Sequence, residues 1–337
     1  MFSGTNQRVG EIERNQQKAG ADIQALEQRC AALEKRAECL EALLNGYENV
    51  LINIRNNNAQ IAALEQSMET MAFKVKRLKK REKANLAPAL ATASDTKQIL
   101  DVRKDCQHSE DSYTSIDYFD FENHFRGDKN LIKERQKQYL PYFKDCKSVV
   151  DIGCGRGEFL QLLAESQINA VGVDTYEEFV DFCQEQGLKA VCDDGNHYLY
   201  NIEHTDGIFV GQVVEHMTTE QIIDLCNIAW EKLEDGGYLI IETPNPTSLA
   251  IYTHAFYIDP SHEKPVHPLT MEYFLKKAGF REINVIYTEC SKLDQTIPRL
   301  GGANIENLEP FNDAMQIVSD TLFGSQDYAI IAKKQNM

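Results

Sequence analysis

The sequence predicts an α/β protein built on a largely parallel sheet and preceded by a long α-helix. From residue 116 onward, apolar strand-like runs alternate with amphipathic segments of helical length. That order requires right-handed crossovers, with helices on both faces of the sheet. From Val9 to Leu78, apolar residues instead recur at alternating steps of three and four, which is typical of a coiled coil. With 337 residues, the chain is long enough for both parts.

Residues 1–83 are predicted to form the coiled coil. No proline precedes Pro88, so we expect a helix of about 70 residues and about 105 Å. A step of three from Ile61 to Leu64, where four is due, predicts local overwinding. One compact domain cannot bury so long a seam, so we expect a dimer or trimer, with packing against a different protein as the alternative. The apolar residues of the seam are Val9, Ile12, Ala19, Ile23, Leu26, Cys30, Leu33, Ala37, Leu40, Leu44, Tyr47, Leu51, Ile54, Ile61, Leu64, Met68, Met71, Val75 and Leu78.

Residues 84–115 are predicted to be a linker, and residues 116–337 a separate globular domain. The stretch 83–96 is rich in Ala, Pro, Ser and Thr and contains few large apolar residues, which ends the rod. The expected strands cover residues 148–152, 169–173, 189–192, 207–212, 238–242, 284–288 and 327–333. The expected helices cover residues 157–166, 176–186, 219–233, 270–278 and 312–322.

Charge and cysteine content exclude several classes of function. The chain carries 35 basic and 52 acidic residues, a net charge of -17, which argues against nucleic acid as a partner because such binding rests on clustered Lys and Arg. Nine cysteines form no C-x-x-C pair, so we expect free thiols in a reducing cytosol and no metal site. No signal-peptide core and no run of about 18 apolar residues occur. We therefore expect a soluble, cytoplasmic protein without a transmembrane segment.

Three glycines interrupt the first strand-to-helix connection of the domain. They lie at alternate positions, Gly153, Gly155 and Gly157, after Asp151 at the end of a buried strand. Glycine is required where the chain turns with positive φ or where a ligand touches bare main chain, so this turn predicts a nucleotide-bearing cofactor. A dinucleotide fingerprint would need a third glycine at Glu158. A ligand-free turn is the alternative.

Further motifs follow in strand order. Asp174 ends the second strand, where an acidic residue commonly binds ribose hydroxyls. The next loop carries Asp193 and Asp194, and the fourth strand leads into V-V-E-H-M, residues 213–217. Together with D-x-G-x-G-x-G, this set resembles class I S-adenosylmethionine (SAM) methyltransferases. The resemblance implies a Rossmann-like seven-stranded sheet and SAM as the cofactor.

Segments outside these motifs resemble a narrower family. They are F-R-G at 125–127, I-K-E-R-Q at 132–136, F-Y-I-D-P-S-H at 256–262, P-V-H-P at 265–268 and L-F-G-S-Q-D-Y-A at 322–329. These segments are similar to bacterial methyltransferases of O-antigen and exopolysaccharide synthesis, specifically to the methyltransferase part of O-polysaccharide chain-terminating enzymes. The resemblance spans roughly residues 116 to 334. It implies a glycan or lipid-linked glycan acceptor and a role in lipopolysaccharide biosynthesis, with capping of chain growth. It also implies a polysaccharide-synthesis glycosyltransferase as partner, which would hold the protein peripherally at the inner membrane.

The resemblance also assigns cofactor contacts. Arg126 is expected to pair bidentately with the SAM carboxylate, although a surface salt bridge is the alternative. A carboxylate such as Asp193 would accept a hydrogen bond from the adenine amino group, with a solvated loop acid as the alternative. Cys154 is expected to be a small filler residue. The full set implied at the cofactor comprises Arg126, Gln136, Asp151, Gly153, Cys154, Gly155, Gly157, Asp174, Asp193, Asp194 and Gln212.

Candidate catalytic residues follow the fourth and fifth strands. A sugar hydroxyl has a pKa far above 7 and needs a general base within hydrogen-bond reach, whereas a terminal phosphate needs basic groups that orient it. Histidine is the side chain most easily poised near neutral pH. For each histidine, the alternative to a catalytic role is a packing role. For His216, a second alternative is a supporting role in the SAM pocket. The candidates are Glu215, His216, Tyr257, His262 and His267.

Several alternatives stay open at this point. Residues 244–268 form a connection long enough for a lid or binding loop, and residues 290–325 either cap the acceptor site or only lengthen the domain. A quinone-like small molecule is a second acceptor class, because the E-H signature is shared with such enzymes. A third interpretation is a coiled-coil scaffold whose domain only binds SAM.

Overall fold

The computed structural model describes residues 3–86, 117–254, 256–288, 291, 296–302 and 305–335. The chain divides into two compact units, Met1–Glu65 and Gln66–Met337. The predicted linker at 84–115 lies outside the described residues except for its first three positions, which are helical.

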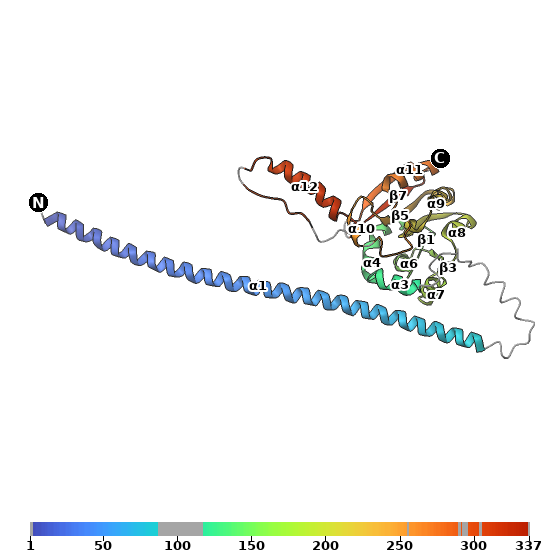
Figure 1. Ribbon diagram of the computed structural model, residues 1–337, viewed down its shortest axis with the longest axis horizontal. Helices are drawn as coiled ribbons and strands as arrows, with labels where there is room; N and C mark the ends of the chain where they lie inside the picture. The colour runs from blue at the N-terminus through green and yellow to red at the C-terminus, as the bar shows by residue number, and fades with distance from the viewer. Residues whose placement is uncertain are drawn as a thin grey trace, which may run out of the picture. The chain divides into compact units, whose positions relative to one another are not determined.

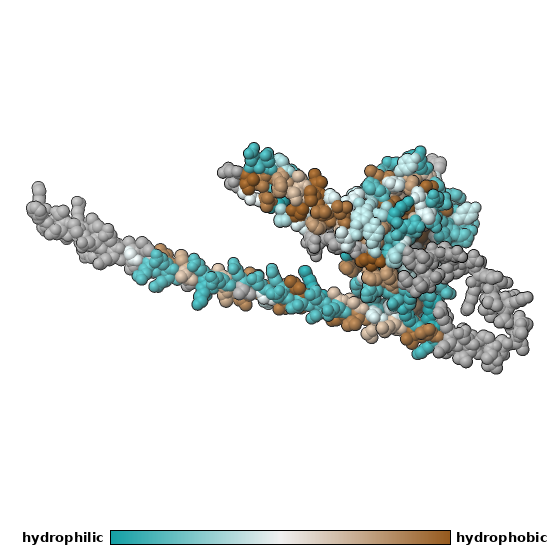
Figure 2. All heavy atoms as spheres, in the orientation of Figure 1, coloured by the Kyte–Doolittle hydropathy of each residue, from teal (hydrophilic) through white to brown (hydrophobic). Residues whose placement is uncertain are grey.

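A single helix, α1 (Ser3–Leu86), forms the N-terminal region and confirms the predicted long helix. Its seam residues with described side chains are exposed; Leu40, Leu51 and Leu64, for example, are 60%, 56% and 65% exposed. Figure 2 shows apolar side chains recurring among hydrophilic ones along this helix. No helix in the described part of the chain is long and apolar enough to cross a membrane.

The last part of α1, from Gln66 onward, belongs to the second unit. Phe73, on the face away from the seam, is 5% exposed. Its ring lies 5.4 Å from that of Phe119 on α3 (Tyr118–Phe125) and 5.3 Å from that of Phe182 on α7 (Glu177–Glu185). The compact domain therefore begins well before residue 116, because an off-seam aromatic side chain fixes the helix end to it.

The domain contains a seven-stranded sheet in the order β3-β2-β1-β4-β5-β7-β6 (Figure 1). The first five strands are parallel, and β7 runs antiparallel between β5 and β6. The strands are β1 (Val149–Ile152), β2 (Ala170–Asp174), β3 (Ala190–Cys192), β4 (Thr205–Gly211), β5 (Leu233–Pro244), β6 (Glu282–Tyr287) and β7 (Asp327–Lys333). The predicted Rossmann-like fold is confirmed.

Helices cover both faces of the sheet, as the alternation along β4 requires. Ile208 and Val210 point into one apolar core, whereas Phe209 points into the other, against Phe143 and Phe159. The remaining helices are α4 (Lys129–Gln136), the 3₁₀ turn η2 (Lys137–Tyr139), α5 (Leu140–Phe143), α6 (Glu158–Glu165), α8 (Gly195–Asn201), the 3₁₀ turn η3 (Val214–His216), α9 (Thr219–Lys232), α10 (Ala250–His254), α11 (Pro268–Ala278) and α12 (Leu308–Phe323). Sequence patterns did not predict the short helices α3, α4, α5, α8 and α10, in which few residues are available to show a period.

Candidate active site

The glycine turn after β1 has the predicted backbone. Gly153, Gly155 and Gly157 have φ values of +69°, +50° and +79°, which L side chains rarely adopt. A Cβ atom at Gly155 would overlap the Arg126 guanidinium, and one at Gly157 would lie 2.8 Å from Cys183 Sγ. Glycine is therefore required both by the conformation and by the space.

Asp174, at the end of β2, is hydrogen-bonded to this turn. Its Oδ2 accepts the Gly155 N–H at 2.9 Å, and its Oδ1 accepts the Tyr176 N–H at 2.9 Å. Burial raises the pKa of Asp174 to about 6, although the two backbone donors lower it. Cys154 is buried beside Gly172, and its role as a small filler stays a prediction.

Arg126 lies over the glycine turn, at the C-terminal end of α3. It forms an ion pair with Glu122, and its guanidinium lies 3.8 Å from the Glu158 carboxylate. These two acids raise the pKa of Arg126 against the effect of burial. The same guanidinium lowers the pKa of the buried Asp151, although burial raises that pKa more. The predicted Arg126 and Asp151 are therefore brought to one place.

Several buried side-chain oxygen atoms of the predicted cofactor residues and of Glu158 have no hydrogen-bond partner in the described structure. They are Asp151 Oδ2, Glu158 Oε2 and Gln136 Oε1. Unsatisfied buried acceptors cost about 1–3 kcal/mol each, so they mark places where a ligand with hydrogen-bond donors binds. An ammonium group beside Asp151, with a carboxylate beside Arg126, matches the amino-acid end of SAM. These side chains beside the glycine turn fit this cofactor.

The adenine-side residues are already engaged within the protein. Asp193 Oδ1 lies 2.8 Å from His197 Nδ1, and Asp194 caps α8 by accepting the His197 N–H at 2.9 Å. The Asp193 N–H donates to the Asp174 carbonyl at 3.1 Å, which places both residues at one edge of the sheet. Asp193 can still receive a ligand at its second oxygen, and its assignment stays a prediction.

Gln212 joins two carboxyl groups that were not among the predicted site residues. Its side-chain amide donates to Glu242 at 3.3 Å and to Asp327 at 3.2 Å. Tyr139 donates to Glu242 as well. Burial and repulsion from Glu242 raise the pKa of Asp327 to about 7, and burial raises the pKa of Glu242 above its usual range. An acidic residue at the end of the apolar run 239–242 was the available sequence signal for this pair.

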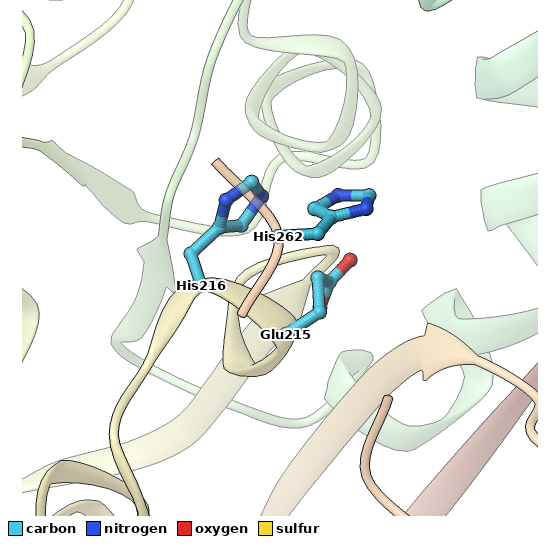
Figure 3. Close-up of side chains that lie close together, drawn as sticks. All are labelled: Glu215, His216 and His262. Atoms are coloured by element: carbon cyan, nitrogen blue, oxygen red, sulfur yellow. The ribbon is translucent and has the colours of Figure 1, made fainter. Parts of the chain in front are cut away.

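Three of the five catalytic candidates converge after β4. Glu215, His216 and His262 each offer a ligand atom, and these atoms all lie within 4.8 Å of one another (Figure 3). The two imidazole rings are 4.6 Å apart, and Glu215 is fully buried. Burial raises the pKa of Glu215 to about 8. Burial and the neighbouring His262 lower the pKa of His216 to about 4, so this imidazole is neutral at pH 7.

The orientation of both imidazoles is fixed by hydrogen bonds. His216 Nδ1 lies 2.8 Å from Ser261 Oγ, and that hydroxyl donates to Asp259 at 2.6 Å. His262 Nδ1 donates to the Phe256 carbonyl at 2.6 Å. The F-Y-I-D-P-S-H segment therefore supplies both a member of the cluster and the groups that orient it.

Tyr257 and His267 lie outside this cluster. The Tyr257 side chain is 70% exposed and contacts the ring of Phe256 edge-on. His267 caps α11, with Nδ1 accepting the Leu269 N–H at 3.2 Å. A capping side chain and a ligand-binding side chain look alike in a sequence, and the catalytic assignment of both residues stays a prediction.

Comparisons with known proteins agree with this geometry. The sequence matches the family described as a methyltransferase domain over residues 123–285. It is also similar to the crystal structure of a SAM-dependent methyltransferase from Archaeoglobus fulgidus, with 40% identity and a TM-score of 0.61 over 65% of this chain and all of the other.

A second similarity covers a short stretch. The probable tRNA methyltransferase 9B of Homo sapiens is 31% identical over 87 residues, which are 26% of this chain and 19% of the human protein. Three observations agree: the similarity covers the whole archaeal enzyme, Asp174 binds the glycine turn, and the sheet has seven strands. The chain belongs to the SAM-dependent methyltransferases, and SAM is its expected cofactor.

Proposed function

We propose that this enzyme methylates an oxygen of a bacterial surface polysaccharide or of its lipid-linked precursor. The observation that supports this most is the convergence of Glu215, His216 and His262 at the same sheet edge as the SAM-binding turn. The segments that resemble the O-antigen family also supply site residues: Arg126, Gln136, His262 and Asp327. A sugar offers several hydroxyl donors, and the buried carboxyl groups of Glu242 and Asp327 can accept them.

The reaction itself is a displacement at carbon. Bound SAM would supply an activated methyl group: the acceptor oxygen would form a C–O bond as the C–S bond breaks, and the sulfur would keep its electron pair. The hydroxyl proton must leave as this bond forms. His216 is neutral, but a base with a pKa of about 4 is poorly matched to a sugar hydroxyl. Positioning in line with the S–C bond is therefore expected to supply most of the rate.

Labelled SAM provides the direct test. Purified full-length protein is incubated with lipid-linked oligosaccharides, extracted O-antigen, a quinone precursor and transfer RNA. We expect label in the glycan fractions and none with Asp174→Ala. Transfer only to the quinone precursor would refute the glycan assignment.

Transfer RNA is included because of the similarity to the human protein. That relative matches only a quarter of this chain, and the net charge of -17 is unfavourable for a polyanionic acceptor. We therefore expect no label in RNA, and label there would overturn the proposal.

We further propose that α1 joins two or three copies of the chain, as a coiled-coil multimer of a surface-glycan methyltransferase. The support is its seam of exposed apolar residues, which includes Leu33 and Leu44 at 62% and 63% exposure. A helix of this length with an unburied stripe is unstable alone in water.

A further inference from the structure

The cluster of Glu215, His216 and His262 has the features of a metal site as well as of an acceptor site. Two ligands bound at about 2.1 Å to one ion lie about 3–4 Å apart. The three ligand atoms here lie within 4.8 Å of one another, so side-chain shifts on the order of 1 Å bring them to that spacing. All three residues come from η3 and the loop after α10, which meet beyond the end of β4.

The hydrogen bonds around the two imidazoles select one tautomer for each. Ser261 Oγ already donates its proton to Asp259, so His216 Nδ1 must donate to Ser261. His262 Nδ1 donates to a backbone carbonyl. Each ring therefore carries its lone pair on Nε2, and no hydrogen bond of either Nε2 is found within the described part of the chain. Metal-bound histidines are held in the same way, with the second ring nitrogen donating to a carbonyl or to a carboxylate.

Glu215 supplies the third ligand. Its Oε2 accepts the Thr243 hydroxyl at 2.9 Å, which fixes the carboxyl group. Its Oε1 is buried with no hydrogen-bond partner in the described structure. A fully buried carboxyl oxygen without a partner is costly unless a cation or donor binds there.

From these observations we propose that Glu215, His216 and His262 bind one divalent transition-metal cation. Two imidazole nitrogens and one carboxylate oxygen suit Zn²⁺ or Mn²⁺, whereas Mg²⁺ prefers oxygen ligands and bound water. Three protein ligands leave at least one open coordination position. This part of the proposal rests on the proposed function: the acceptor oxygen binds at the open position. There the cation lowers the pKa of the acceptor hydroxyl, and the hydroxyl proton passes to solvent water.

This proposal differs from the expectation, based on cysteine spacing, that the chain has no metal site. That reasoning considered C-x-x-C patterns, whereas these ligands are Glu215, His216 and a histidine 46 residues further on. A loop contact brings them together, which no spacing rule detects.

Metal retention tests the site without any acceptor. Full-length protein is treated with a chelator, loaded separately with Zn²⁺, Mn²⁺, Co²⁺ or Mg²⁺, desalted, and analysed for bound metal; the visible spectrum of the Co²⁺ form reports nitrogen ligation. We expect about one transition-metal ion per chain and no Mg²⁺. Glu215→Gln and His262→Gln should each lose this ion. Ser261→Ala, which removes only the group that orients His216, should weaken affinity roughly 10- to 100-fold.

The matched control is His204→Gln, an exposed histidine just before β4, at the opposite end of the strand from the cluster. It should retain metal like the wild type, and all variants should bind SAM, which shows that they are folded. Equal metal retention in the wild type and in His262→Gln, as expected for adventitious binding to free cysteines, would overturn the site. Retained metal without glycan methylation would refute the acceptor assignment alone, and full methylation by metal-free protein would refute the metal's role alone.

Discussion

Replacing Phe73 with alanine tests whether the end of α1 supports the cofactor site. The side chain is 5% exposed and packs between Phe119 and Phe182, with ring centroids 5.4 and 5.3 Å away. Truncating a buried phenylalanine costs about 3–5 kcal/mol. The lower end applies here, because the helix end can separate from the domain instead of keeping a cavity. Glu69→Ala, four residues earlier, exposed and outside the seam, should change stability by less than about 0.5 kcal/mol.

Hydrogen exchange and SAM titration measure this effect together. In Phe73→Ala, we expect loss of amide protection in residues 66–79 and in α3, and SAM affinity reduced roughly 10-fold because α3 carries Arg126. Deletion of residues 1–65 should leave both properties intact, whereas deletion of residues 1–85 should reproduce the mutant, because it removes Phe73. Unchanged protection and SAM affinity in Phe73→Ala would refute the idea that the helix end supports the site.

Three further predictions follow from the same structure. Arg126→Lys keeps the positive charge but loses the planar guanidinium with its paired N–H donors, so SAM should bind roughly 10-fold more weakly, with little change in melting temperature. Equal SAM affinity of both proteins in calorimetry would exclude Arg126 as the partner of the SAM carboxylate. Asp327→Asn removes a buried carboxyl whose folded pKa is raised from 3.8 to about 7. The proton bound to it stabilises the folded wild type below pH 4, and this stabilisation is lost as pH rises through 7. The variant should therefore be as stable as the wild type near pH 4 and more stable by up to about 4 kcal/mol above pH 8. Urea titrations in which the stabilities of both proteins change in parallel with pH would contradict this. Leu33→Lys with Leu40→Lys and Leu44→Lys should yield monomers in light scattering, since lysine at seam positions opposes association, whereas an unchanged mass would exclude the seam as the interface.

Local sequence patterns predicted the glycine turn after β1 and the acidic residue at the end of β2. Gly155 and Asp174 are only 19 residues apart, and their hydrogen bond follows from two adjacent parallel strands that each end in a turn. Strand and helix alternation likewise predicted the first five strands. Such features depend on sequence period and short spacing, which one chain displays directly.

Contacts between distant segments were not predictable in the same way. Gln212 meets Asp327 across 115 residues, because β7 enters the sheet antiparallel next to β5. Ser261 meets His216 across 45 residues through the long loop. Neither a period nor a motif encodes such pairings. Capping roles such as that of Asp194 were equally hidden, since the same side chain caps a helix or binds a ligand.

The short helix α3 connects these parts physically. Phe119 packs on α1, Glu122 pairs with Arg126 over the glycine turn, and Tyr118 donates a hydrogen bond at 2.8 Å to Asp259, whose other oxygen accepts from the serine that orients His216. Burial raises the pKa of Tyr118, so this hydroxyl keeps its proton and remains a donor. A displacement of α3 therefore moves Arg126, the predicted partner of the SAM carboxylate, together with the His216 ring. Because one eight-residue helix carries all three contacts, separation of the end of α1 from the domain is expected to affect cofactor and acceptor binding at once.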